Sequence, residues 1–186
     1  MILWLDGAFG AGKTTLAEEL HRRVPDALPF DPEYIGFLLR AWAPAPEGGD
    51  FQDMPLWRRL TAEFAVGLHR EYGRPVITPM TLVDTGHRDE IFGLIAAAGV
   101  SLRHVFLDVP ADELRRRIDA QVLDPDDPRA DADARAFRLR NVERCVAARA
   151  ALPPDTLVLR ADRHGPGQLA DQVLATYFRA VPLKNV

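Results

Sequence analysis

The chain has 186 residues, of which 47% are hydrophobic and 27% charged, and its formal net charge at pH 7 is −4. This composition is typical of a globular protein, and the length predicts one domain with a core that needs no disulfide or metal. The negative charge argues against nucleic-acid binding as the main function, and the single cysteine excludes an intrachain disulfide. The amino-terminal apolar run is too short for a signal peptide or a transmembrane segment, so we expect a cytoplasmic protein.

The first elements of the chain form a nucleotide-binding pattern. Residues 2–5 are apolar and predict a buried strand, and residues 16–23 have the spacing of a helix. Between them residues 7–15 match the G-x-x-x-x-G-K-[ST] phosphate loop, in which backbone N–H groups face phosphate oxygens. The lysine of such a loop reaches the β- and γ-phosphates, and the hydroxyl that follows it binds Mg²⁺. The expected nucleotide-binding residues are Gly7, Ala8, Phe9, Gly10, Ala11, Gly12, Lys13, Thr14 and Thr15.

The rest of the chain alternates between strand and helix patterns. We expect strands at 27–30, 75–80, 102–109 and 156–160, and helices at 33–41, 53–72, 87–98, 111–121, 135–150 and 166–180. Strands separated by helices predict an α/β three-layer sandwich with a central parallel sheet of about five strands. Ligands of such sheets bind beyond the carboxyl ends of the strands, so Asp31, Thr81 and the residues after Val109 are candidates for one crevice.

Asp31 follows the second expected strand and has two interpretations. Its carboxylate is placed to accept the proton of an acceptor hydroxyl or to hold Mg²⁺ through water. It is also a good helix N-cap, because Pro32 stands at the first helical position and Glu33 in the first turn. The two roles are compatible. With Thr14, Asp31 is therefore our candidate for the metal site.

A polar segment at 122–134 has no apolar period and lies between two expected helices. It predicts a lid that closes over phosphates and excludes water, and the alternative is a plain loop. Residues 50–58 mix aromatic and polar side chains, which suits a heterocyclic or sugar-like acceptor. The alternative is that Phe51 and Trp57 belong to the core. The chain has no Asn-Lys-x-Asp guanine signature, which favours ATP over GTP, and no acid on the strand at 75–80 for a second magnesium contact.

The phosphate loop, Asp31 and residues 107–110 followed by Arg117 together resemble the nucleoside-monophosphate-kinase branch of P-loop kinases. The resemblance implies that Arg117 packs on adenine and opens a lid, and that Arg138 resumes the helix after it. These arginines, with Lys13 and Asp31, are the catalytic residues that the resemblance suggests. The usual second lid arginine would fall near residue 121, which is Gln121 here.

Within that branch the chain is similar to tunicamycin-resistance ATP-binding proteins up to about residue 150. The similar segments are 31–40, 50–58 and 76–81. The resemblance implies ATP and Mg²⁺ as cofactors, an acceptor-binding region at 31–73, a lid at 121–137 and a nucleoside-like antibiotic as the substrate. The expected acceptor-binding residues are Asp31, Glu33, Arg40, Phe51, Gln52, Arg58 and Thr81.

Two hypotheses about function follow. In the first, the protein is an ATP-dependent phosphotransferase for a small molecule such as tunicamycin. In the second, it binds ATP and sequesters the ligand without phosphoryl transfer, which Gln121 and the missing strand acid favour. Either protein would be a monomer or a homodimer that binds a small molecule.

Overall fold

The structure, a computed structural model, describes residues 1–44, 46, 49–122 and 125–178. Within this part of the chain, five strands form one parallel sheet in the spatial order β2-β3-β1-β4-β5, which confirms the predicted fold class. The strands are β1 (Ile2–Gly7), β2 (Leu28–Pro29), β3 (Val76–Pro79), β4 (Leu102–Asp108) and β5 (Leu157–Arg160).

The central strand β1 is buried on both faces of the sheet. Ile2 and Trp4 belong to one hydrophobic cluster, and Leu3 and Leu5 belong to the other. All four side chains are fully buried. Side chains of a strand alternate between faces, so a strand covered on both sides reads as a continuous apolar run. This explains why the sequence pattern at 2–5 predicted a strand.

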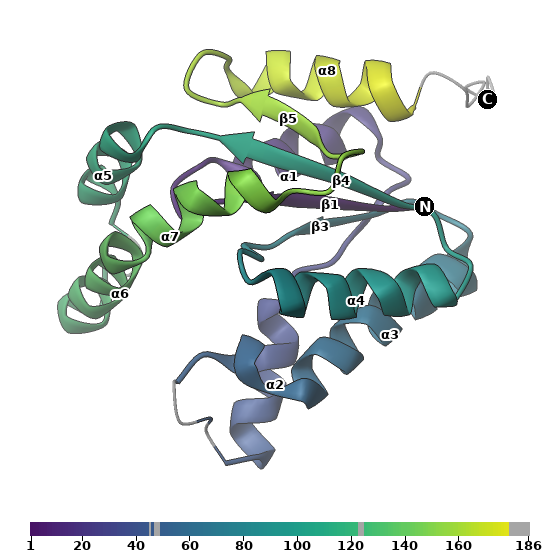
Figure 1. Cartoon of the computed structure of the whole chain (residues 1–186), viewed down its shortest axis with the longest axis horizontal. Helices are drawn as coiled ribbons and strands as arrows, with labels where there is room; N and C mark the ends of the chain where they lie inside the picture. The colour runs from purple at the N-terminus through teal and green to yellow at the C-terminus, as the bar shows by residue number, and fades with distance from the viewer. Residues whose placement is uncertain (45, 47–48, 123–124, 179–186) are drawn as a thin grey trace.

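Helices cover both faces of the sheet (Figure 1). The helices α1 (Lys13–Arg23) and α8 (Pro166–Tyr177) pack on one face, and α3 (Pro55–Tyr72) and α4 (Thr85–Ala97) pack on the other. Beyond the carboxyl ends of the strands lie α2 (Glu33–Trp42), on the side of α3, and α5 (Ala111–Ala120), α6 (Pro128–Arg140) and α7 (Val142–Ala147), on the side of β4. Two 3-10 turns, Phe51–Asp53 and Ala148–Ala151, complete the described elements.

Several expected elements have different boundaries. The strand expected at 27–30 pairs with β3 over two residues only. The helix expected at 53–72 begins at Pro55, after a 3-10 turn in which Asp50 accepts a hydrogen bond from the Gln52 N–H. The last helix ends at Tyr177, and its expected last two residues lie outside the described part of the chain.

The expected helix at 135–150 was wrong at its start and at its middle. Helix α6 begins at Pro128, because Asp127 accepts hydrogen bonds from the N–H groups of Arg129 and Ala130. It ends at Arg140, and α7 follows after Asn141. An Asp-Pro start signal therefore outweighed the polar composition that had suggested an irregular lid through residue 134. Two residues of that lid, 123 and 124, lie outside the described residues.

No helix in the described part of the chain is both long enough and apolar enough to cross a bilayer.

Candidate active site

The phosphate loop joins β1 to α1 and has a backbone that depends on glycine. Gly7, Gly10 and Gly12 have φ angles of 136°, 77° and 98°. At Gly7 a Cβ would also lie 2.8 Å from the carbonyl oxygen of Leu107, so a side chain at this position would collide with β4. The loop therefore packs closely against β4 at Gly7, whereas the space around Gly12 is open.

The amino-terminal end of α1 fits a phosphate group. Gly12 stands at the N-cap and has no side chain to accept the hydrogen bonds of the first turn. The N–H groups of that turn and the positive end of the helix dipole are therefore available to an anion. The exposed Thr14 hydroxyl lies in the same turn, where it fits Mg²⁺ held mainly by substrate phosphates. Among the described residues, no cluster of three or more acidic, His or Cys side chains offers a separate metal cage.

Lys13 lies inside the loop. Its ammonium group donates hydrogen bonds to the carbonyl oxygens of Gly7 and Ala8, both at 2.9 Å. Removal from water lowers the pKa of Lys13 to about 8, although the Asp6 carboxylate acts in the opposite direction. Negative charge placed at the loop would restore the ordinary pKa, so the position suits a phosphate.

A crevice of about 220 Å³ opens beside the loop, where five segments distant in sequence meet, one of them the end of α5 at Gln121. It brings together ten predicted site residues, which come from the loop, the start of α2, the end of β3 and α6. The lining residues are Phe9, Gly10, Gly12, Lys13, Thr14, Thr15, Asp31, Glu33, Pro79, Met80, Thr81, Gln121 and Arg138.

Asp31 lines the crevice two residues before α2 begins. Its Oδ1 accepts a hydrogen bond from the Glu33 N–H at 2.9 Å, but the N-cap of α2 is Pro32, so the expected N-cap position of Asp31 was wrong by one residue. Partial burial raises the pKa of Asp31, while that hydrogen bond and the charge of Lys13 act to lower it. A carboxylate with a raised pKa is a stronger base, which suits proton acceptance from a hydroxyl.

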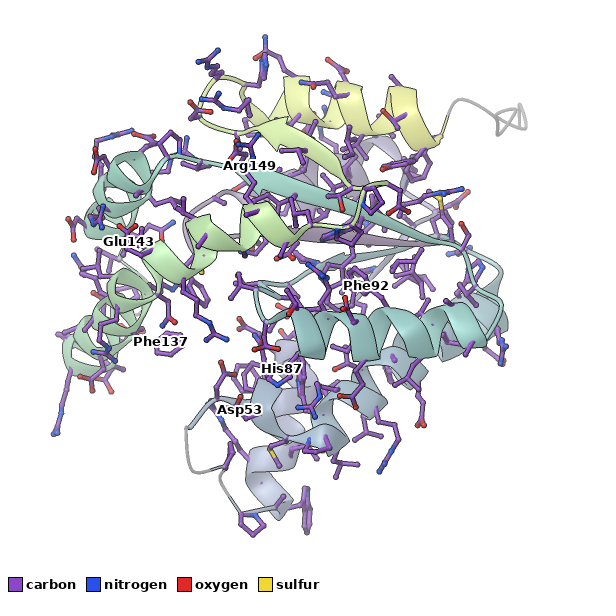
Figure 2. The ribbon with its side chains drawn as sticks, in the orientation of Figure 1. Asp53, His87, Phe92, Phe137, Glu143 and Arg149 are labelled. Carbon is purple, nitrogen blue, oxygen red and sulfur yellow. The ribbon has the colours of Figure 1, made fainter. Side chains whose placement is uncertain are left out.

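Arg138 reaches the crevice from α6. Its Nη1 donates to Oε1 of Gln121 at 3.1 Å, and its guanidinium carbon lies 5.8 Å from the centre of the Phe9 ring. The neighbouring Phe137 lies on the inner side of α6 (Figure 2). Gln121 was not among the predicted site residues, although its departure from the kinase pattern was the signal that could have identified it.

Two of the expected acceptor residues connect the acceptor region to the loop. The Thr81 hydroxyl donates to the Gly7 carbonyl oxygen at 3.0 Å, and Nε2 of Gln52 donates to the Thr81 carbonyl oxygen at 2.9 Å. Next to Gln52, the Phe51 ring packs on α2, and Arg40 lies 5.4 Å from its centre. These two hydrogen bonds connect the 3-10 turn to the phosphate loop through Thr81.

The lining described for the crevice does not include the expected residues Arg40, Phe51, Gln52, Arg58 and Arg117. Arg58 donates to Glu90 and to the Gln52 carbonyl oxygen, so it supports the 3-10 turn from behind. Arg117 donates to Glu113 and to the Ala161 carbonyl oxygen, which ties α5 to the segment after β5.

Trp57 is fully buried and donates to the Pro32 carbonyl oxygen, as its core interpretation predicted.

Asp6 is a buried residue that was not predicted from the sequence, and its carboxylate anchors the start of the phosphate loop. Its Oδ1 accepts hydrogen bonds from the N–H groups of Gly7 at 2.6 Å and Leu82 at 2.9 Å. Its Oδ2 lies 3.3 Å from Nε2 of His104. The sequence signal that could have identified Asp6 was an acidic residue directly after the apolar residues 2–5 of β1. Asp6 holds together the chain segments that leave β1 and β3.

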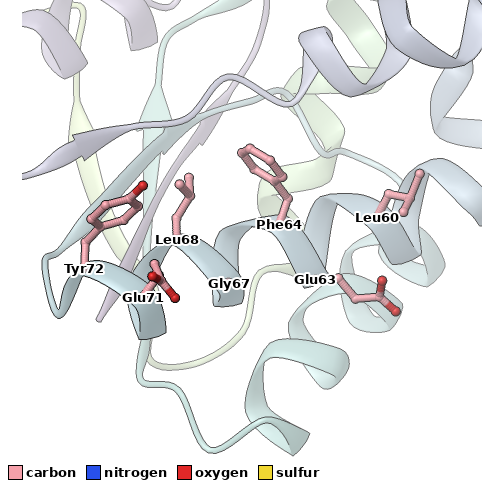
Figure 3. A pocket seen from close by; sticks show the side chains of 7 residues that line it. All are labelled: Leu60, Glu63, Phe64, Gly67, Leu68, Glu71 and Tyr72. Carbon is pink, nitrogen blue, oxygen red and sulfur yellow. The ribbon is translucent and has the colours of Figure 1, made fainter.

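A larger hollow of about 430 Å³ runs along α3 (Figure 3). Its lining is mostly apolar, and its charged groups are the carboxylates of Glu63 and Glu71. Phosphate binding needs cations and N–H donors, which the smaller crevice supplies and this hollow does not. The polar lining of the crevice at the phosphate loop, rather than its volume, therefore identifies it as the candidate active site.

A family model described as an AAA domain matches residues 2–145, a range that includes the phosphate loop, Asp31 and Arg138. The chain belongs to this family. Its fold is the P-loop kinase-like fold, which confirms the expected resemblance. No sequence among the curated proteins matches the chain.

Solved structures of a tunicamycin resistance protein and of small-molecule kinases share this fold. The tunicamycin resistance protein of Deinococcus radiodurans is 28% identical over 94% of both chains, with a TM-score of 0.68. The APS kinase of Mycobacterium tuberculosis, in complex with AMPPNP and APS, is 20% identical over 94% of this chain and 95% of its own, with a TM-score of 0.63. The shikimate kinase of Acinetobacter baumannii is 15% identical over 95% of this chain and 92% of its own, with a TM-score of 0.56.

Proposed function

We propose that the protein is a cytoplasmic ATP-dependent phosphotransferase that acts on a hydroxyl group of a small molecule. We further propose that this acceptor is a nucleoside-like antibiotic such as tunicamycin. The observation that carries the proposal is one crevice in which Lys13 and Arg138 face Asp31 and Glu33. The similarity to a tunicamycin resistance protein supports the choice of acceptor.

Each group in the crevice has a role in this reaction. Bound ATP would supply the phosphoryl group and Mg²⁺ would neutralise part of its charge, and Thr14 and Asp31 would hold the metal, Asp31 through water. Asp31 takes the proton of the acceptor hydroxyl, whose oxygen forms a bond to the γ-phosphorus as the bond to the leaving ADP oxygen breaks. Lys13 and Arg138 stabilise the charge that develops on the transferred group. Arg117 is proposed to pack on the adenine.

The acceptor is proposed to lie between Asp31 and the 3-10 turn. Phe51 would offer an aromatic face there, and Arg40, Gln52 and Thr81 are placed around it. Arg58 would act indirectly, by holding the turn in place.

A mass measurement tests transfer directly. The protein is incubated with Mg²⁺, ATP and tunicamycin, and then with a set of nucleosides and sugars, and the mass of each acceptor is recorded. We expect one acceptor to gain a phosphoryl group while an equal amount of ADP appears. Absence of a phosphorylated product from every acceptor contradicts the proposal.

The alternative function is ATP-dependent sequestration of the ligand without transfer. Two observations favour it: Gln121 occupies the place of a lid arginine, and the β3 strand carries no acid. In that case the ligand would co-purify with the protein unaltered in mass, and its retention would depend on ATP.

A further inference from the structure

We propose that Phe9 is a positioning residue whose ring holds Lys13 and Arg138 in the arrangement that recognises the γ-phosphate. The proposal rests on the nucleotide site proposed above and assigns a function to a side chain that the phosphate-loop motif leaves unspecified. It also explains how a chain with Gln121 in place of a lid arginine still places a cation at the crevice.

The aromatic ring of Phe9 contacts both cations. The Lys13 ammonium nitrogen lies 5.7 Å from the ring centre, and the Arg138 guanidinium carbon lies 5.8 Å from it. Both distances are within the range of about 6 Å over which a cation is attracted to an aromatic face. Phe137 packs edge-on against the same ring, with centres 5.6 Å apart, so α6 contacts the loop through two consecutive residues.

Two like charges that converge on one crevice repel each other before any phosphate is bound. The charge of Arg138 is one cause of the lowered pKa of Lys13. The negative face of an aromatic ring offsets part of this repulsion and replaces part of the lost hydration. Gln121 holds the other side of Arg138 through its Oε1. The ring and the amide together fix a long side chain that would otherwise sample many rotamers.

The position of Arg138 indicates which phosphate it serves. Lys13 lies inside the loop, against the Gly7 and Ala8 carbonyl oxygens, where both nucleoside di- and triphosphates bind. Arg138 enters from α6 and interacts electrostatically with Glu33, on the acceptor side of the crevice. The phosphate nearest the acceptor is the γ-phosphate. Arg138 should therefore distinguish ATP from ADP, and loss of the Phe9 ring should reduce that distinction.

The test measures the affinities of Mg²⁺-ATP and Mg²⁺-ADP by calorimetry, without an acceptor. Phe9→Leu keeps an apolar side chain but removes the ring, and we expect the ratio of ATP to ADP affinity to fall about three- to thirtyfold. Phe9→Tyr restores a ring and should recover most of the ratio. Phe178→Leu, the same change at the end of α8, is the matched control and should leave the ratio unchanged.

A double-mutant cycle distinguishes positioning from general damage to the loop. Arg138→Met should lower the ratio by itself, and adding Phe9→Leu to Arg138→Met should lower it little further. Gln121→Ala is a second route to the same effect and leaves the phosphate loop intact. An unchanged ratio in Phe9→Leu, or an equal loss from Phe9→Leu with and without Arg138, overturns the proposal. Failure of the unmodified protein to bind either nucleotide would instead refute the proposed function, and this inference with it.

Discussion

The ammonium group of Lys13 lies within a loop of carbonyl oxygens, and its pKa falls to about 8. A lysine in water stays protonated to a much higher pH. Without bound nucleotide, Lys13 therefore loses its proton near pH 8, where most other lysines remain protonated. Nucleotide phosphates favour the charged form, so binding of nucleotide and binding of this proton are linked.

We expect ATP affinity to be constant below pH 8 and to weaken above it. Above its folded pKa the empty-site lysine is neutral, so each binding event must take up a proton, and affinity falls by up to about tenfold per pH unit. Calorimetry in buffers of different ionisation enthalpy measures the proton uptake. Lys13→Arg remains charged and should bind without this uptake. Zero uptake by the unmodified protein near pH 8 and above would contradict the linkage.

Asp31 should affect turnover far more than nucleotide binding. Asp31→Asn keeps an oxygen that accepts the Glu33 N–H but removes the base, so we expect kcat to fall by about 10²- to 10⁴-fold. ATP affinity should change by less than about threefold, because the expected contact to Mg²⁺ is through water. Asp26→Asn, an exposed aspartate before β2, is the matched control. Equal kcat values for Asp31→Asn and the unmodified protein would show that Asp31 is not the general base.

At the scale of elements, α2 and the 3-10 turn meet at a glycine. A Cβ at Gly36 would lie 2.6 Å from the Phe51 ring, which itself packs against Trp57 with centres 5.2 Å apart. Glycine inside a helix ordinarily lowers stability relative to alanine. Here its small size lets the acceptor region pack onto α2.

Two alanine substitutions in helices should therefore have opposite effects on the free energy of unfolding. Gly36→Ala gains about 1 kcal/mol of helix propensity but forces the Phe51 ring to move, at a cost of about 1–3 kcal/mol. We expect its free energy of unfolding to fall by about 1 kcal/mol on this balance. Gly93→Ala, on the exposed side of α4 with nothing within 4 Å of the added Cβ, should raise it by about 0.5–1 kcal/mol.

Urea titration of both variants gives the comparison, with the midpoints as the readout. A stabilised Gly36→Ala would show that the α2 contact with Phe51 is not tight.

The elements that the sequence predicted well are those with strong local signals. The phosphate loop and its helix are contiguous in sequence, and β1 is apolar on both faces. The start of α6 was missed because its polar composition was given more weight than the Asp127 cap and Pro128. Local signals mark Gln121 and Asp6 as unusual positions, but they do not reveal the partners that define their roles, Arg138 and His104, which lie 17 and 98 residues away.

At the scale of the whole molecule, the parallel sheet determines which segments meet. The carboxyl ends of β1 and β3 adjoin, so the phosphate loop, Thr81 and the start of α2 share one edge. Helix α6 approaches the same edge from the side of β4 (Figure 1). A ligand in this crevice would contact segments that follow β1, β2 and β3 as well as α6, and should stabilise the entire fold.

Nucleotide should accordingly raise the melting temperature. At a free concentration about 100 times its Kd, a ligand adds about 2.7 kcal/mol to the free energy of unfolding. For a chain of this length that corresponds to a shift of roughly 5–10 °C. Differential scanning calorimetry with Mg²⁺-ATP measures it, and Arg22→Ala, on the exposed side of α1, is a control that should show the same shift. A melting temperature independent of ATP would contradict a crevice that joins these segments.

Titration calorimetry of the purified protein with Mg²⁺-ATP tests most directly whether this loop binds a triphosphate. We expect saturable binding of one ATP per chain, and loss of that binding in Lys13→Ala. Failure of the unmodified protein to release or absorb heat with millimolar ATP or GTP would contradict it, as would equal affinities for ATP in the unmodified protein and Lys13→Ala.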